Sequence, residues 1–200
     1  MTWIDRTAPE HAHGPLAELY QRVHGPDGGV DNILQAHSLR PHTLAGHMGL
    51  YKSVLHHPAN SLDPWFREAL GVLVSQLNKC EYCVAHHTAG MRRLIDDDAR
   101  SDVVAAALTS GSWGDALDSG QRAALAYARA LTVNPSALDA LDIDDLRAAG
   151  WDDGEILEIN QIVAYFAYAN RTVLGLGVET DGERLGAAPV GGDEDDWRHA

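Results

Sequence analysis

Residues 63–95 read DPWFREALGVLVSQLNKCEYCVAHHTAGMRRLI, a stretch that holds both cysteines of the chain, Cys80 and Cys83. Asp63 before Pro64 is typical of a helix start, and apolar residues continue at helical spacing to about position 78. A second helix should begin near Cys80. The stretch therefore predicts two helices joined by a short turn, which pack antiparallel as a helical hairpin.

The hairpin, expected at about residues 62–95, brings reactive side chains together. Positions equidistant from the turn lie side by side in such a hairpin, and the turn falls midway between Glu68 and His87. These two side chains should therefore face each other. Cys83 precedes His87 by four residues, so the two share one face of a helix. We expect the thiol, the imidazole and the carboxylate to meet in one small pocket.

The rest of the chain also shows helical spacing, and no stretch alternates apolar and polar residues over six or more positions. We expect an all-α helical bundle. Residues 1–180 should form a single domain, and the Gly-rich, acidic segment 181–200 a flexible tail outside the core. Further helices are expected to begin at Pro15, at Pro41, at Ser119 as a cap, at Asp142, and at a capping box of Asp152 and Glu155, the last of them ending at Gly175 and Gly177.

Acidic residues outnumber basic ones, because 29 Asp and Glu against 15 Lys and Arg give a formal net charge of −14 at pH 7. Such a charge repels phosphates and anionic lipid, which argues against nucleic-acid and membrane-surface partners. No apolar run approaches the roughly 18 residues of a membrane span, and the first residues lack the pattern of a signal peptide. A cytoplasmic protein is expected.

Two cysteines three positions apart do not staple a fold; in a reducing compartment such a pair more often binds metal or performs redox chemistry. The reactive thiolate is only about 3% of a cysteine with pKa about 8.5 at pH 7. A helix N-terminus stabilises it by about 0.3–1 kcal/mol, less than the roughly 2.7 kcal/mol that a two-unit pKa shift needs. A neighbouring imidazole that accepts the proton closes this gap. His87 is therefore the candidate base, and Glu68 the group that orients it.

The attacking sulfur is chosen by comparing two effects. The helix dipole favours Cys80, which is nearer the helix start, whereas the imidazole of His87 favours Cys83. Because the dipole is the smaller effect, we assign Cys83 as the attacking thiolate and Cys80 as the resolving thiol. A peroxide is a natural target, since the thiolate becomes a sulfenic acid and the second cysteine condenses with it to a disulfide. An external dithiol must then reopen that disulfide.

Two other functions stay open at this point. Cys80, Cys83 and His87 can act as zinc ligands, with Glu68 or one of the ten other histidines as the fourth, in a zinc-stabilised helical scaffold or interaction protein. A hard carboxylate oxygen among soft ligands argues against such a site. A dithiol carrier or sensor without peroxidase turnover would use the same cysteine pair.

Other polar residues receive lesser roles. Tyr82 is either a packing residue or a proton donor, and His86, about 100° around the helix from His87, is expected at the surface or behind the site. Asn170 and Arg171 are expected to be structural. Four further histidines are expected to be exposed or at oligomer contacts: His42, His47, His56 and His57.

In this all-helical setting the motif resembles the core of alkylhydroperoxidase D (AhpD), within the carboxymuconolactone decarboxylase-like superfamily. The matching positions are Glu68, Cys80, Cys83 and His87, and the sequence Cys-Glu-Tyr-Cys is similar to the peroxidase-related branch. The resemblance covers about residues 30–180. Softer matches flank the motif: Asn32-Ile33, Ser38-Leu39-Arg40-Pro41, Leu146-Arg147-Ala148-Ala149-Gly150 and Asn170-Arg171.

The resemblance implies an all-α thiol peroxidase that reduces hydrogen peroxide or organic hydroperoxides. It implies no bound cofactor or metal, a dithiol electron donor of thioredoxin-like or lipoyl type, and a homo-oligomer that is a trimer, dimer or hexamer. Its position-by-position roles are a proton-relay carboxylate at Glu68, a resolving cysteine at Cys80, a peroxidatic cysteine at Cys83 and a relay histidine at His87.

One position departs from the family pattern. The best-known members carry a histidine where this chain has Tyr82, and tyrosine accepts protons poorly at neutral pH but can donate a hydrogen bond. Carboxymuconolactone decarboxylases proper lack the cysteine pair, which argues against ring decarboxylation.

Overall fold

The computed structural model describes residues 2–189 and 197–199. Within these ranges the chain is helical, and the only extended pairing is an isolated bridge between Pro189 and His199. The α-helices are α1 (Pro15–Val23), α2 (Asn32–Gln35), α3 (Pro41–Tyr51), α4 (Pro64–Leu77), α5 (Glu81–Ile95), α6 (Asp98–Ser110), α7 (Ser119–Val133), α8 (Ala140–Ala148) and α9 (Asp153–Leu176). Shorter turns are the 3₁₀ segments η1 (Pro9–His11), η3 (Gly114–Ala116) and η4 (Pro135–Ala137) and the π-helical segment η2 (Lys52–His56). The predicted all-α class is confirmed.

The helix ends follow the sequence signals closely. Asp152 and Glu155 form the expected capping box at the start of α9, and the helix ends at Gly177, whose φ of 62° is easy for glycine. Gly175, by contrast, lies inside α9. The cap of α7 is Asp118 rather than Ser119, because the Asp118 carboxylate accepts the N–H of the third helical residue.

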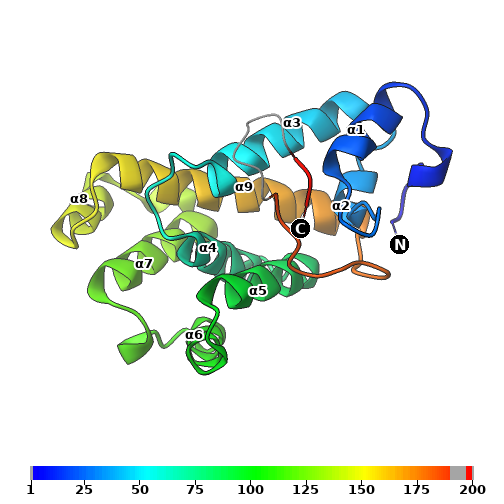
Figure 1. Cartoon of the computed structure of the whole chain (residues 1–200). Coiled ribbons are helices and arrows are strands. Elements are labelled where there is room, and N and C mark those ends of the chain that lie inside the picture. The colour runs from blue at the N-terminus through cyan, green and yellow to red at the C-terminus, as the bar shows by residue number, and fades with distance from the viewer. Residues whose placement is uncertain (1, 190–196, 200) are drawn as a thin grey trace.

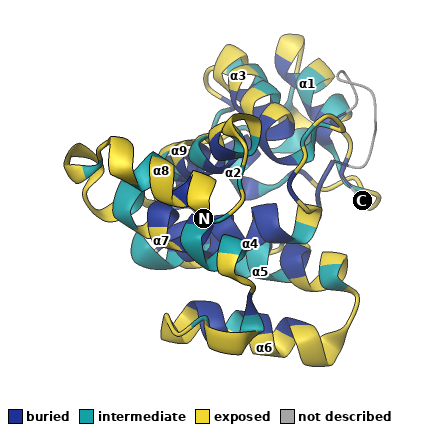
Figure 2. Ribbon diagram, turned by 90° about the vertical axis from the view of Figure 1, so that its left-hand side faces the viewer, coloured by how far each residue is buried: buried dark blue, intermediate teal, exposed yellow. Residues whose placement is uncertain are grey.

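Helix α9 runs through the middle of the bundle, with α3 on one side and the α4–α5 hairpin on the other (Figure 1). The buried side chains gather where α4, α7 and α9 meet (Figure 2). One close approach fixes the distance between α4 and α9: a Cβ added at Gly71 would lie 2.1 Å from the ring of Phe166. Only glycine at this position allows the two helices to pack as they do.

Helix α6 is present in the structure but was not predicted from the sequence. It lies at the edge of the molecule with one side exposed (Figure 2), and its inward residues include Ser101, Val104 and Leu108. The polar Ser101 and the small Ala107 on this side weaken the apolar stripe from which a helix would be predicted. No helix in the described ranges combines the length and the apolarity that crossing a bilayer requires.

The segment after α9 was expected to be a flexible tail outside the core. Its described part instead runs back from the end of α9 between α2 and α5 (Figure 1), and Ala188 is buried. Trp197 belongs to the core, where the Arg22 guanidinium lies 3.9 Å from the centre of its ring. Residues 190–196 and 200 lie outside the described residues, and the mobility of the tail stays a prediction.

Candidate active site

The α4–α5 hairpin places Glu68 opposite His87, as the sequence predicts. His87 Nδ1 lies 2.6 Å from Glu68 Oε2, and only 3% of Glu68 is exposed. The carboxylate fits because Gly90 has no side chain: a Cβ there would lie 3.3 Å from the same oxygen. The predicted contact between acid and imidazole is therefore present.

The contact between Glu68 and His87 favours the ionised carboxylate of Glu68 and determines which nitrogen of the His87 ring donates. Burial by itself would raise the pKa of Glu68, but the charge and hydrogen bond of His87, aided by His56 and Arg93, hold that pKa below its ordinary value. An ionised carboxylate only accepts hydrogen bonds, so Nδ1–H of His87 donates to Glu68, and Nε2 is the ring atom that remains for proton exchange. Phe166 meets the ring edge-on at 4.5 Å between centroids and holds its plane.

The two thiols lie at the start of α5. Cys80 is the residue that precedes the first helical turn, and Cys83 follows within that turn. Both are free and buried, and their sulfur atoms lie 2.9 Å apart. This spacing is close to what a disulfide needs, since an S–S bond is about 2.05 Å long and joins residues whose Cβ atoms are near neighbours.

The two thiols form a hydrogen bond in which the Cys80 S–H donates to Cys83 while both are protonated, and once Cys80 loses its proton Cys83 becomes the donor. The hydrogen bond from Cys83 outweighs burial and lowers the pKa of Cys80, and the backbone N–H of Cys83 and the side chain of Asn170 add to the effect. Cys83 is the reverse case, because its bond to Cys80, its burial and the negative charge on Cys80 raise its pKa. In the resting pair the first proton is thus lost from Cys80, while the sequence expectation was a thiolate at Cys83.

Polar side chains from α4 and α9 support the sulfur atoms from behind. Asn170 Nδ2 donates to Ser75 Oγ at 3.0 Å, and Asn78 Nδ2 donates to Asn170 Oδ1 at 2.9 Å. Asn170 and Ser75 also lower the pKa of Cys83 through hydrogen bonds. The sequence treated Asn170 as structural; an amide inside the apolar stripe of α9 was the signal that pointed to a buried polar partner.

A cavity of about 50 Å³ lies beside these groups. Cys83, Glu68 and His87 all line it, so the three groups expected in one pocket share one. Cys80 instead lines a separate groove on the other side of α5, together with Trp3 and residues 173–180 near the end of α9. Cys83 is therefore the thiol on the cavity side, and Cys80 lies behind it.

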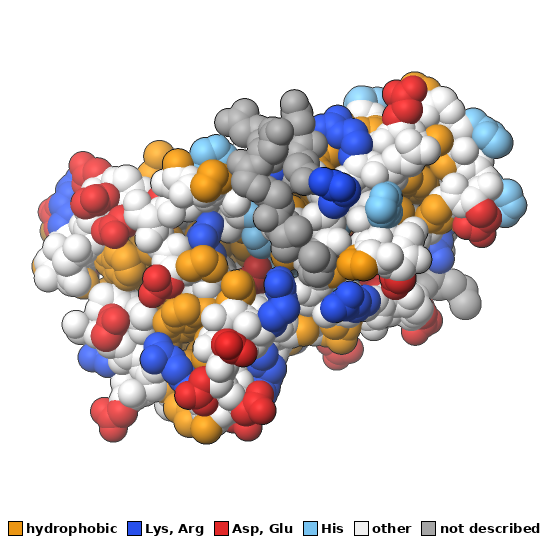
Figure 3. Space-filling view, in the orientation of Figure 1, with side chains coloured by type: hydrophobic (Ala, Val, Ile, Leu, Met, Phe, Trp, Pro, Cys, Tyr) orange, Lys and Arg blue, Asp and Glu red, His pale blue; other side chains and the backbone are white. Residues whose placement is uncertain are grey.

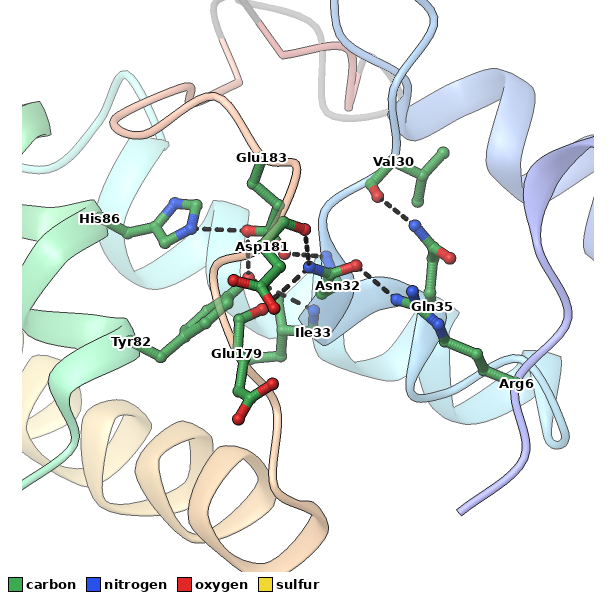
Figure 4. A network of polar contacts seen from close by, with 10 residues as sticks. All are labelled: Arg6, Val30, Asn32, Ile33, Gln35, Tyr82, His86, Glu179, Asp181 and Glu183. Carbon is green, nitrogen blue, oxygen red and sulfur yellow. Dashed lines mark hydrogen bonds and ion pairs between the residues drawn. The ribbon is translucent and has the colours of Figure 1, made fainter. Parts of the chain in front are cut away.

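Tyr82 and His86 form a second pair on α5, beside the site. Their rings stack at 4.5 Å between centroids, and both contact the same carboxylate oxygen of Glu183: Tyr82 Oη at 2.8 Å and His86 Nε2 at 2.7 Å (Figure 4). The backbone N–H of Ile33 donates to Tyr82 Oη at 3.3 Å. His86 is buried rather than at the surface, and the hydroxyl of Tyr82 makes its hydrogen bonds to Glu183 and to the backbone of α2.

The sequence expectation for His47 was wrong. This residue, expected to be exposed or at an oligomer contact, is 3% exposed and lines the cavity. Burial lowers its pKa to about 3, and its Nε2 lies 3.4 Å from Tyr165 Oη. His56 is similar, since burial lowers its pKa to about 4 against an opposing effect of Glu68. Both rings are neutral near pH 7, a state that single-sequence periodicity does not reveal.

The zinc alternative can be compared with the geometry. Among the described residues no group of three or more His, Cys, Asp or Glu side chains is arranged to hold a metal ion. Two thiolates on one tetrahedral zinc, each bound at about 2.3 Å, would lie about 3.8 Å apart. The observed separation of 2.9 Å is shorter.

Fold and site together define a class of protein: an all-helical bundle with a buried dithiol and an acid–imidazole pair on one helical hairpin. Residues 41–130 match the model of the Carboxymuconolactone decarboxylase family. No curated protein is recognisably similar in sequence to the chain. The family match and the structural neighbours below support the resemblance to AhpD-like and carboxymuconolactone decarboxylase-like proteins.

Three solved structures show how widely the fold is shared. An uncharacterized peroxidase-related protein from Ralstonia eutropha JMP134, an AhpD core, is similar with a TM-score of 0.75 and 22% identity over 89% of this chain and 91% of its own. One from Silicibacter sp. TM1040 has a TM-score of 0.72 and 23% identity over the same shares. The debrominase Bmp8 has a TM-score of 0.67 and 21% identity over 90% of this chain and 91% of its own. These likenesses establish the fold, on which more than one chemistry exists.

Proposed function

We propose that the protein is a thiol-dependent peroxidase, an oxidoreductase that reduces a peroxide with electrons from Cys80 and Cys83. The observation that carries the proposal is the cavity that Cys83 shares with the Glu68–His87 pair, with the sulfur of Cys80 only 2.9 Å behind. A thiol that faces a small cavity, a base beside it and a second thiol in contact are the parts that peroxide reduction by a dithiol needs.

The reaction begins with ionisation of the thiol pair. One proton passes from the pair to Nε2 of His87, and the carboxylate of Glu68 stabilises the imidazolium through Nδ1–H. Cys80 is the thiol that ionises first, because its hydrogen bond with Cys83 lowers its pKa, and the Cys80 thiolate then accepts the S–H of Cys83. As Cys83 attacks, its proton crosses to Cys80 along this contact. The charge then resides on the sulfur that faces the cavity.

The chemical steps balance with two thiols and one peroxide. The thiolate of Cys83 bonds to one peroxide oxygen while the O–O bond breaks; the departing hydroxide takes the proton from His87 and leaves as water. Cys83 is now a sulfenic acid. The sulfur of Cys80 attacks it, and a disulfide forms with loss of a second water.

A dithiol donor from outside must return the disulfide to two thiols by exchange, so the enzyme cycles between two states. We propose that the site performs this without a bound metal or cofactor. We propose also that the protein works in the cytoplasm as a homo-oligomer.

Single substitutions of Cys83 and Cys80 test the role that we assign to each cysteine. Cys83→Ser should abolish thiol oxidation by hydrogen peroxide, because the hydroxyl is not a nucleophile at neutral pH. Cys80→Ser should be oxidised to a sulfenic acid that dimedone traps, and it should form no disulfide within the chain. Peroxide consumption and mass spectrometry of each variant measure this. Oxidation of Cys83→Ser together with an inert Cys80→Ser would reverse the two roles and contradict the assignment.

A further inference from the structure

The cavity that contains the reactive thiol is small and has a wall from the far end of the chain. Its volume of about 50 Å³ holds only a few water-sized molecules, since one water needs roughly 10–15 Å³ by this measure. Helices α2, α3, α4, α5 and α9 provide most of its lining. Gly186, Ala187 and Ala188 of the C-terminal segment complete it, together with His199.

Glu183 fixes this segment in place. Its side chain is 4% exposed, and one carboxylate oxygen accepts hydrogen bonds from Tyr82 and contacts His86 on α5. The other oxygen accepts the backbone N–H of Asn32 at the start of α2 (Figure 4). A single buried carboxylate thus ties the C-terminal segment to both walls of the cavity.

Two further contacts hold the segment on the same two helices. The Asn32 side chain donates to the backbone carbonyls of Glu179, at 2.9 Å, and Asp181, at 3.1 Å. Gly186, with φ of 78°, lies so close to α5 that a Cβ there would be 2.9 Å from the backbone nitrogen of Gly90. The segment therefore packs directly against Gly90, the residue whose lack of a side chain leaves space for Glu68.

We propose that residues 181–189 act as a substrate-size filter, which restricts the enzyme to hydrogen peroxide and peroxides of similar size and excludes bulky organic hydroperoxides. The inference rests on the proposed function, and it names the substrate class of that site. Hydrogen peroxide fits a space of a few waters, whereas the phenyl ring of cumene hydroperoxide exceeds it. Loss of the Glu183 contacts would release the wall and admit larger substrates.

The experiment compares single-turnover rates of thiol oxidation by hydrogen peroxide and by cumene hydroperoxide in full-length protein. We expect the wild-type protein to react with cumene hydroperoxide at least about 100-fold more slowly, as expected for steric exclusion from a packed pocket. Glu183→Ala should reduce this ratio by about tenfold. Asp181→Ala is the matched control, because it removes an acid from the same segment whose side chain is exposed; its ratio should equal that of the wild-type protein.

A second variant covers the case in which Glu183→Ala fails to fold. Ile33→Ala shortens a half-buried residue that lines the same cavity, and it should reduce the ratio as well. Equal wild-type rates with the two peroxides, or a ratio unchanged in both Glu183→Ala and Ile33→Ala, would overturn the size filter. Failure of the proposed function gives a different result, in which hydrogen peroxide itself leaves the thiols unoxidised in the wild-type protein.

Discussion

Each of the two thiols changes the acidity of the other, because the thiolate of Cys80, once formed, accepts the S–H of Cys83. Cys83 donates to Cys80, so the pKa of Cys80 is lowered and that of Cys83 is raised. The nucleophile in the proposed reaction therefore depends on proton transfer inside the pair as well as on His87. The pKa of Cys80 therefore depends mainly on its hydrogen bond with Cys83.

A pair of substitutions tests this coupling. Cys83→Ala removes the S–H donor, so the pKa of Cys80 should rise; Cys83→Ser keeps an O–H donor at the same place, so the pKa should stay closer to that of the wild-type protein. The pH dependence of thiolate ultraviolet absorbance measures both. An identical pKa in the two variants would show that the helix N-terminus and not the partner thiol controls Cys80.

The buried ring of His47 predicts a loss of stability in mild acid. Its pKa is about 3 in the folded protein and about 6.5 when unfolded, so between these values the unfolded chain binds a proton that the folded one does not. The free energy of unfolding should fall as the pH drops below about 6.5, by at most about 1.4 kcal/mol per pH unit from this group.

Urea unfolding at several pH values between 7 and 5 measures this slope. The neutral variant His47→Gln should show a shallower slope than the wild-type protein. His11→Gln, at an exposed histidine, should keep the wild-type slope. A slope that is the same in all three proteins would contradict the assignment of His47 as a buried neutral ring.

Contacts between residues were predicted correctly from the sequence where the residues lie close together along the chain. Glu68 and His87 meet because they are equidistant from one tight turn, and no distant part of the fold is needed to place them. The burial of His47 and the support from Asn170 depend on helices far apart in sequence. No local pattern carries that information.

At the scale of elements, the α4–α5 hairpin depends on a close contact with α9. Gly71 lets the ring of Phe166 approach α4, and Phe166 in turn meets His87 edge-on. Local capping and turn signals predicted the hairpin and the start of α9. They could not predict the α4–α9 distance, because that distance depends on the volume of one ring in a helix almost a hundred residues away.

Gly71→Ala tests this contact. The added methyl group would overlap the Phe166 ring, so the variant should lose about 1–3 kcal/mol of stability through overpacking. It should also oxidise its thiols more slowly with peroxide, because the displaced ring no longer holds His87. Thermal unfolding and single-turnover kinetics measure the two effects.

Gly175→Ala is the matched control, since nothing lies within 4 Å of a Cβ at this position in α9. Its stability should be unchanged or up to about 1 kcal/mol higher, because alanine is the better helix former. Equal stability and equal rates for Gly71→Ala and Gly175→Ala would refute the role of the Gly71–Phe166 contact.

At the scale of the whole molecule, the two ends of the chain close around one hairpin. Acidic, basic and hydrophobic side chains are interspersed on the face that Figure 3 shows, and the chain as a whole carries a net charge of −14. The sequence predicted the helical class and the resemblance to AhpD-like proteins, because the hairpin motif and the helical periodicity are local. It missed the packed part of the C-terminal segment, since Gly-rich, acidic composition is also typical of unstructured tails.

The homo-oligomer and the dithiol donor stay predictions.

The most direct measurement of the central claim is the free-thiol count and intact mass of the reduced wild-type protein after one equivalent of hydrogen peroxide. The account predicts that both thiols disappear together, that the mass falls by two hydrogen atoms, and that a dithiol restores the starting protein. Two thiols still free after the peroxide is added, or an added oxygen atom that persists without a disulfide, would contradict it.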